Sequence, residues 1–199
     1  LRDAGLLPPD TDLHGFFLLD PRTRTSQIVR SRSPVASGTG TYSRTLCMAS
    51  TLPGTQAYRD AWDLTMDAAE AANEPGSFTA FIGYEWTSTE KGINLHRVVV
   101  YRDDESKAGV MEPYTTLSPV GSPDPRDLWK WMADYESRTG GRLLAIAHNG
   151  NMSNGHMFPE DRTYFGARVD KNYAATRARW EPLYETTQIK GDGEAHPFL

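Results

Sequence analysis

The sequence has little cysteine and no long hydrophobic run. Its one cysteine, Cys47, excludes an internal disulfide and a zinc cluster built from cysteines. No run of about 18 apolar residues occurs, so no segment is expected to cross a membrane. The formal net charge of −5 argues against broad binding to the phosphate backbone of nucleic acids. We therefore expect a soluble protein without a nucleic-acid partner, in either the cytoplasm or the periplasm.

Several catalytic signatures are also missing. The chain has no phosphate-binding loop ending in Gly-Lys-Ser/Thr and no dinucleotide-binding fingerprint. It also has no Gly-x-Ser-x-Gly nucleophile elbow and no His-Glu-x-x-His zinc helix. These absences point away from P-loop enzymes, dinucleotide-dependent oxidoreductases, serine hydrolases and zincin proteases.

The 199 residues are enough for one domain or most of one. The chain begins at Leu1, without methionine or a signal segment, and stops soon after a polar cluster, which predicts a piece of a longer protein, truncated at both ends. Residues 1–54 are rich in turn-forming residues and predict a loosely structured lead-in, with a short strand or a helix turn at residues 15–19. Residues 55–199 predict an α/β domain.

Apolar periodicity divides this α/β domain into helices and strands. Thr55 and Asp124 are expected to cap the first two helices. The short link between the first two strands predicts that they are antiparallel neighbours. A long loop is expected at residues 103–123. Helices are predicted at residues 55–72, 124–139 and 170–179, and strands at residues 78–86, 94–102, 143–147 and 182–189.

His148 stands at the end of the most clearly apolar strand. The strand at residues 143–147 has five apolar residues in a row, and Asn149 and Gly150 then begin a polar turn. In α/β folds, ligands and catalytic groups collect where strands end. An imidazole held there suits a metal ligand or a general base, and the alternative is a histidine that is hydrogen-bonded to a nearby loop.

Three further ionisable groups lie within apolar strands, namely Glu85, His96 and Glu185. A carboxylate is costly to bury in such a strand unless it is paired or bound to a cation. Glutamate and histidine together form a ligand set that suits zinc, manganese or iron. Several such groups on successive strands could converge on one end of a sheet.

Each of these groups also has a simpler interpretation. Glu85 could form a salt bridge with Arg97 or Arg102 across the hairpin. His96 could be an ordinary hydrogen-bonded strand histidine. Glu185 is expected to make hydrogen bonds beside the site more readily than to bind a metal directly, although ligation stays an alternative.

Two polar segments could complete a site. Residues 149–158 are rich in amides and glycine, and backbone N–H groups in such turns can bind an oxyanion. Within them, His156 could donate a proton to a leaving group or simply be exposed. Lys190 could face an anionic group of a substrate or the solvent. The tail could surround a cation or remain a solvated loop. Its ionisable residues are Asp192, Glu194 and His196.

The family becomes recognisable from four motifs, which read FTAFIGYEWTS, GINLHRVVVYRD, LLAIAHNGNMSNGHMF and EPLYETTQIKGDGEAHP. They closely resemble the bacterial family known as domain of unknown function three-six-zero-four, in family order from about residue 78 to 197. That family is similar to a distant branch of the PHP superfamily (polymerase and histidinol phosphatase), which comprises metal-dependent phosphoesterases on a distorted seven-stranded (β/α) barrel. The resemblance implies an α/β chain that forms the central part of such a PHP-like barrel.

The resemblance also implies a site with two or three divalent manganese, iron or zinc ions in the full-length protein. Glu85 matches a metal-bridging glutamate, and His96 and His148 match later histidine ligands. Glu185 lies in a matching glutamate-containing stretch. The superfamily pattern opens with His-x-His and an Asp-His pair and closes with Asp-x-His, and none of these occurs here. We therefore expect weak metal binding and little activity from this piece alone.

The resulting hypothesis is a fragment of a metal-dependent hydrolase that activates water to attack a small phosphate or sulfate ester. Two alternatives stay open: a non-catalytic scaffold that has lost its metals, and a metal-free glycosidase using Glu85 and Glu185, whose carboxyl groups would then lie about 5–10 Å apart. The expected metal ligands are Glu85, His96 and His148; the expected catalytic residues are His148 and His156; the expected substrate-binding residues are Asn149, Asn151 and Lys190.

Overall fold

The computed structural model describes residues 14–19, 26–30 and 53–193 of the chain. The chain divides into two compact units, Leu1–Met48 and Ala49–Leu199. In the first unit, β1 (His14–Leu19) pairs with β2 (Ser26–Arg30) as an antiparallel hairpin, so residues 15–19 form a strand and not a helix turn. The remaining elements belong to the second unit.

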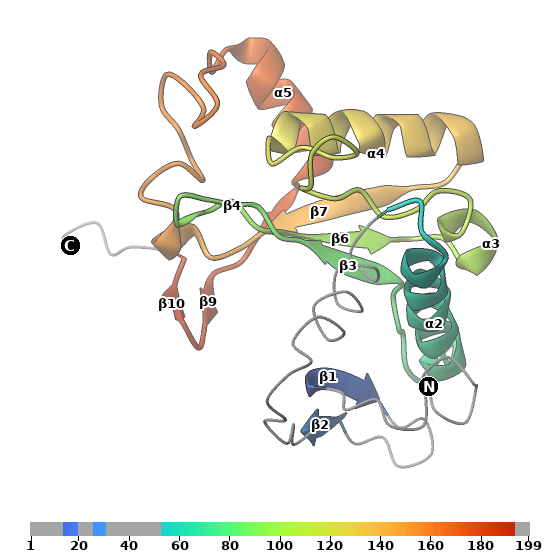
Figure 1. The fold of residues 1–199 in the computed structure, drawn as a ribbon. Coiled ribbons are helices and arrows are strands. Elements are labelled where there is room, and N and C mark those ends of the chain that lie inside the picture. Colours follow the sequence, from blue (N-terminus) through green and yellow to red (C-terminus); the bar gives the residue numbers. More distant parts are fainter. Residues whose placement is uncertain (1–13, 20–25, 31–52, 194–199) are drawn as a thin grey trace, which may run out of the picture. The chain divides into compact units, whose positions relative to one another are not determined.

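The second unit is built around a mixed sheet of four strands. The strands are β3 (Gly83–Trp86), β6 (Arg97–Tyr101), β7 (Leu143–Ala147) and β8 (Leu183–Tyr184), in that order across the sheet. The pairs β3–β6 and β6–β7 are antiparallel, whereas β7–β8 is parallel. Figure 1 shows β6 and β7 lying side by side in the middle of this sheet.

Two small hairpins extend from the sheet. One is formed by β4 (Thr89–Glu90) and β5 (Ile93–Asn94), which lie between β3 and β6 in the sequence. The other is formed by β9 (Thr187–Gln188) and β10 (Gly191–Asp192), which follow β8 (Figure 1). A short 3-10 helix, η1 (Gly150–Met152), begins just after β7.

Three of the helices begin where the sequence predicts, because each starts with a capping side chain. The oxygens of Thr55, Asp124 and Asp170 accept hydrogen bonds from backbone N–H groups of the first helical turns. These helices are α2 (Gln56–Ala72), α4 (Pro125–Thr139) and α5 (Lys171–Trp180). The predicted loop at residues 103–123 also contains one short helix, α3 (Glu105–Ala108).

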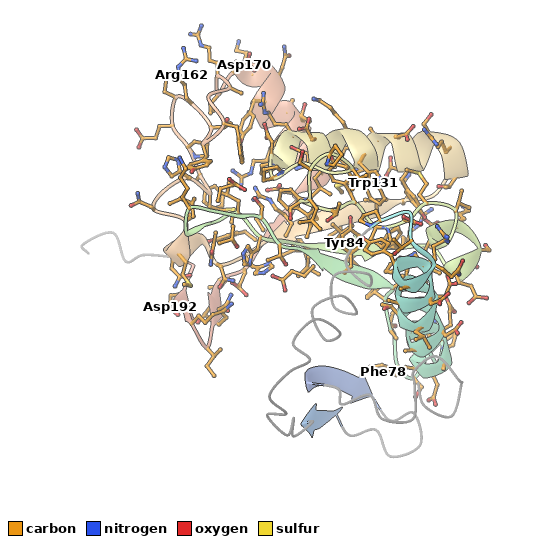
Figure 2. All side chains as sticks on the ribbon, viewed as in Figure 1. Phe78, Tyr84, Trp131, Arg162, Asp170 and Asp192 are labelled. Atoms are coloured by element: carbon orange, nitrogen blue, oxygen red, sulfur yellow. The ribbon has the colours of Figure 1, made fainter. Side chains whose placement is uncertain are left out.

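One face of the sheet carries the apolar core. Along β6 and β7 every second residue is buried, while the residues between them are only half-buried. Both α4 and α5 contact β7, as Figure 1 shows for α4. The ring centroids of Trp62 on α2 and Tyr84 on β3 lie 5.9 Å apart. The ring centroids of Tyr84 and Trp131 on α4 lie 6.3 Å apart in an edge-on arrangement (Figure 2). The core helices therefore cover one face and leave the other partly open.

The mixed α/β class is confirmed, but three predicted strands are shorter than expected or divided. Of residues 94–102, Asn94 belongs to β5 and only 97–101 form β6. Of residues 78–86, only 83–86 form a strand, and the exposed Phe78 and Phe81 precede it. The single strand predicted at residues 182–189 is wrong, because β8 ends at Tyr184 and β9 pairs with β10 instead. The described residues form open sheets of four and two strands, so the closed barrel stays a prediction. None of their helices is long and apolar enough to span a membrane.

Candidate metal centre

The strand register places Glu85, His96 and His148 on the same face of the sheet. Glu85 on β3 is paired with Val98 on β6, and Val98 is paired with Ile146 on β7. His96 lies two residues before Val98, and His148 lies two residues after Ile146. Because side chains two residues apart point to the same face of a strand, all three face away from the buried core. We call these three residues the Glu85–His96–His148 cluster.

The two imidazoles of this cluster converge on one carboxylate oxygen. Nδ1 of His96 lies 3.1 Å from Oε1 of Glu85, and Nε2 of His148 lies 3.2 Å from the same oxygen. The imidazole rings stand edge to face with their centroids 5.6 Å apart. One ligand atom from each residue lies within 4.8 Å of the other two. Such spacing is suitable for a single bound cation.

Each imidazole directs its second nitrogen away from Glu85. Nε2 of His96 lies 2.7 Å from Oγ1 of Thr89. Nδ1 of His148 makes a long contact of 3.5 Å with the carbonyl oxygen of Ile146. In contrast, Nδ1 of His96 is buried and forms no hydrogen bond, although Oε1 of Glu85 is only 3.1 Å away. A polar atom that is buried without a hydrogen-bond partner is costly.

The electrostatics of the cluster favour a neutral imidazole at His96. Burial lowers the pKa of His96 below its ordinary value, and the charges of His148 and Lys190 act in the same direction. The carboxylate of Glu85 raises the pKa of His96 but does not offset these effects. A neutral imidazole keeps the lone pair that a metal ligand requires.

Glu85 provides the open side of the cluster. Its side chain is 48% exposed, whereas those of His96 and His148 are 11% and 10% exposed. The donor set therefore consists of one carboxylate and two nearly buried imidazoles with an approach from solvent. This combination fits zinc, manganese or iron and leaves room for further ligands.

Glu185 lies beside the cluster but belongs to a different hydrogen-bond network. Its Oε2 accepts hydrogen bonds from the backbone N–H of Asn149 at 3.1 Å and from Nε2 of Gln188 at 2.6 Å. Partial burial opposes ionisation, but these hydrogen bonds, helped by the charges of His148 and Lys190, lower the pKa of Glu185. The ionised carboxylate thus fixes the turn that follows His148.

The three expected substrate-binding residues lie on two segments that touch each other. Nδ2 of Asn151 donates a hydrogen bond to the backbone oxygen of Lys190 at 3.0 Å, which connects η1 to the β9–β10 hairpin. The charge of Lys190 acts on both His96 and Glu185. Asn149 is fully buried in the left-handed conformation, and both polar atoms of its side chain lack a hydrogen-bond partner.

The other expected residues are not brought into the cluster. His156 packs edge-on against Tyr164 at 5.1 Å, and its backbone N–H binds the carbonyl of Ser153. Asp192 is exposed on the β9–β10 hairpin, where its carboxylate accepts a hydrogen bond from the hydroxyl of Thr187 (Figure 2). Glu194 and His196 lie outside the described residues.

The salt bridge considered for Glu85 is wrong. Arg97 is opposite Trp86 in the register, so its side chain points into the core, where Nε lies 2.9 Å from Oε1 of Glu181. Nη2 of Arg102 instead lies 3.8 Å from Oδ1 of Asp103. Glu85 therefore contacts the two histidines and neither arginine.

Sequence reasoning missed Thr89, which contacts His96 from the β4–β5 hairpin. A turn is readable there from Gly92, and in the structure Lys91 and Gly92 both adopt the positive φ that a two-residue hairpin turn of type I′ requires. The polar run Thr87, Ser88 and Thr89 does not reveal which hydroxyl reaches the imidazole.

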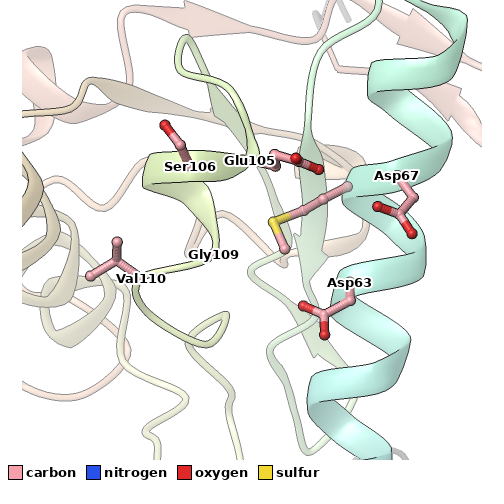
Figure 3. Close-up of a pocket in the computed structure, with 7 residues that line it drawn as sticks. Asp63, Asp67, Glu105, Ser106, Gly109 and Val110 are labelled. Carbon is pink, nitrogen blue, oxygen red and sulfur yellow. The ribbon is translucent and has the colours of Figure 1, made fainter.

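A separate cavity of about 530 Å³ opens between α2 and α3 (Figure 3). Its lining includes the carboxylates of Asp63, Asp67 and Glu105, together with Met66. No residue of the Glu85–His96–His148 cluster lines it, and it offers no imidazole. We therefore place the candidate chemistry at the cluster and not in this cavity.

Comparison with known families identifies the chain. Residues 18–199 match the family described as Protein of unknown function (DUF3604), and the chain belongs to that family. The resemblance to family three-six-zero-four is thereby confirmed. Searches of curated proteins and of solved structures give no match.

Proposed function

We propose that this member of the DUF3604 family carries part of the active site of a metal-dependent hydrolase for phosphate or sulfate esters. One observation carries the proposal: two imidazole nitrogens approach one carboxylate oxygen at 3.1 and 3.2 Å, and one of these nitrogens is buried without a hydrogen bond. Lone pairs and a carboxylate repel one another unless a cation or a proton lies between them. A divalent metal ion satisfies all three groups at once.

The residues of the cluster and of the neighbouring turn have separate roles in this proposal. Glu85, His96 and His148 hold the ion, which would activate water and polarise the ester. Lys190 attracts the anionic ester group, since its charge already acts on His96 and Glu185. Asn151 orients the substrate from the turn that Glu185 fixes through the backbone N–H of the fully buried Asn149. His156 has no role in this proposal, because it packs against Tyr164 and is not brought into the cluster.

The first prediction concerns metal affinity. After treatment with a chelator, the chain is titrated with zinc and with manganese by calorimetry. We expect the chain to bind an ion. Glu85→Gln and His148→Ala each remove a ligand, so each should weaken binding by more than the roughly 10–100-fold that is typical of losing an outer-shell partner. His156→Ala serves as the matched histidine control and should leave the dissociation constant unchanged.

Hydrolysis of 4-nitrophenyl phosphate and 4-nitrophenyl sulfate is then measured with and without added metal. We expect any turnover to require the metal and to disappear with Glu85→Gln. A chain that binds neither ion would support the scaffold alternative and overturn the proposal. Turnover that needs no metal and is lost on changing either Glu85 or Glu185 would support the glycosidase alternative.

A further inference from the structure

We propose that Met152 is a site of reversible oxidation, at which a hydroperoxide converts the thioether to a sulfoxide that binds the side-chain amide of Asn94. The modification joins the β4–β5 hairpin more firmly to η1. The oxidation and the new hydrogen bond require no bound metal, so they do not rest on the proposed hydrolase.

Met152 is far more exposed than three other methionines of the chain. It is 46% exposed on η1, whereas Met66, Met132 and Met157 are 5%, 0% and 1% exposed. Oxidation turns a flexible apolar side chain into a polar one, which disrupts a packed core. At a half-exposed residue the added oxygen stays in contact with water. Met152 can therefore be oxidised while the fold remains intact.

The sulfur of Met152 already has a polar neighbour. Nδ2 of Asn94 on β5 donates a hydrogen bond to this sulfur at 3.7 Å. A thioether sulfur is only a weak acceptor. Because the exposed side chain can rotate, an oxygen placed on the sulfur lies within reach of the same amide. Oxidation therefore keeps the partner and replaces a weak acceptor with a strong one.

The oxidation is a two-electron transfer of one oxygen atom. A lone pair of the Met152 sulfur attacks one oxygen of the hydroperoxide, the O–O bond breaks and the S=O bond forms. The proton of the attacked oxygen passes to the leaving oxygen. The hydroperoxide is thereby reduced to water, or to an alcohol where it is organic. Methionine sulfoxide reductases reverse the change.

The contact between Asn94 and Met152 joins the two segments that carry the histidines of the cluster. Asn94 lies two residues before His96, and Met152 lies four residues after His148. The backbone N–H of His148 also donates to the carbonyl oxygen of His96 at 3.2 Å. A stronger hydrogen bond from Asn94 therefore adds to the connection between these segments.

The second prediction is that dilute hydrogen peroxide oxidises Met152 before the three buried methionines in the folded, chelator-treated chain. Peptide mass mapping follows the addition of one oxygen at each methionine separately. We expect Met152 to react at least about 10-fold faster, because buried thioethers react only when the fold opens. The chain unfolded in urea is the control, and these four methionines should react there at similar rates. Similar rates in the folded chain would overturn the assignment of the site.

The side-chain amide protons of Asn94, observed by NMR, provide the second readout. We expect them to shift downfield and to exchange more slowly with solvent after oxidation, and to return after treatment with a methionine sulfoxide reductase. Met152→Leu has similar volume and no sulfur, so these protons should not respond to peroxide in this matched control. Amide protons that stay unchanged in the oxidised wild-type chain would overturn the proposed hydrogen bond.

The effect on zinc affinity is the one consequence that rests on the proposed function. Oxidation of Met152 should tighten zinc binding by about 2–10-fold, the range that one net hydrogen bond supplies, because His96 and His148 are then held together more firmly. Asn94→Ala removes the donor and should abolish this gain. An unchanged zinc affinity in the oxidised wild-type chain would contradict the coupling to the cluster.

The two proposals can fail separately. If the wild-type chain binds no zinc but the Asn94 amide responds to peroxide, the proposed hydrolase fails while the oxidation site stands. If zinc binds but the amide does not respond, the sulfoxide bond fails while the metal site stands.

Discussion

At the scale of single residues, Glu181 is the most completely paired charge in the described part of the core. Its side chain is 2% exposed and accepts hydrogen bonds from Nε of Arg97 at 2.9 Å, Nε1 of Trp129 at 2.8 Å and Nε of Arg177 at 3.0 Å. Arg97 is 1% exposed and follows His96 directly. This ion pair therefore anchors the start of β6 beside the candidate metal centre.

The third prediction is that Glu181→Gln lowers the free energy of unfolding by about 3–5 kcal/mol, because it leaves the buried Arg97 without its counter-charge. Urea denaturation at neutral pH measures this loss. Asp134→Asn is the matched control, since it breaks an exposed pair with Arg138 and should cost about 0.5 kcal/mol or less. Equal losses in the two variants would contradict the interpretation.

The pH dependence of stability gives an independent check on Glu181. Burial works to raise the pKa of Glu181, but Arg97 and Arg177 outweigh it and hold the pKa below its ordinary value. A depressed pKa in the folded state means that the carboxylate stabilises the fold above the unfolded-state pKa of about 4.3. That contribution is lost as the pH falls through the folded-state pKa, so Glu181→Gln should show a flatter acid limb than the wild type.

The residues of the candidate site were easier to choose from the sequence than their partners. Glu85, His96 and His148 were recognisable because ionisable groups are unusual in apolar strands. The partner of Arg97 was not recognisable, because Glu181 is 84 residues away along the chain. Strict alternation along the two paired strands would already have excluded a bond between Arg97 and Glu85.

At the scale of elements, the turn after β7 depends on a very close approach to β8. A Cβ atom added at Gly150 would lie 1.9 Å from the hydroxyl oxygen of Tyr184. That hydroxyl donates to the carbonyl of Gly193 at 3.3 Å, and the ring packs edge-on against Phe158 at 4.8 Å. Glycine at position 150 therefore lets β8 and the segment that carries Glu185 lie beside His148.

The fourth prediction is that Gly150→Ala destabilises the fold by about 1–3 kcal/mol, as is usual when a side chain is forced into filled space. Urea denaturation measures the change in the wild-type background and in Tyr184→Phe. Without the hydroxyl, the nearest ring atom would lie 3.1 Å away, so Gly150→Ala should cost less in that background. An equal cost in both backgrounds would show that the clash is not with Tyr184.

Helices and strands differed in how far the sequence could predict them. Helix starts were readable because Thr55, Asp124 and Asp170 supply a local signal, the capping hydrogen bond. Strand ends were not readable, because a strand continues only as far as a neighbouring strand is present to pair with it. Residues 78–82 have strand-forming side chains, but β6 ends at Tyr101, whose N–H binds the carbonyl of Ile82.

At the scale of the whole sheet, the candidate metal centre joins segments that are distant in the sequence. Glu85 on β3 and His148 after β7 are 63 residues apart, and their side chains come within 3.2 Å only when β3, β6 and β7 are paired. The unfolded chain has no such arrangement. A cation that binds all three residues must therefore bind the folded state far better than the unfolded state.

The fifth prediction follows from this linkage. With free zinc at about 100 times its dissociation constant, the free energy of unfolding should rise by about 2.7 kcal/mol, and a chelator should reverse the rise. Urea denaturation with and without zinc measures it. Glu85→Gln removes a ligand from the half-exposed side of the cluster, so it should leave the zinc-free stability nearly unchanged while removing most of the zinc-dependent rise. An equal zinc-dependent rise in the free energy of unfolding of Glu85→Gln would mean that zinc binds elsewhere. Stabilisation through the cluster requires the paired strands to present the Glu85 carboxylate to both imidazoles at once.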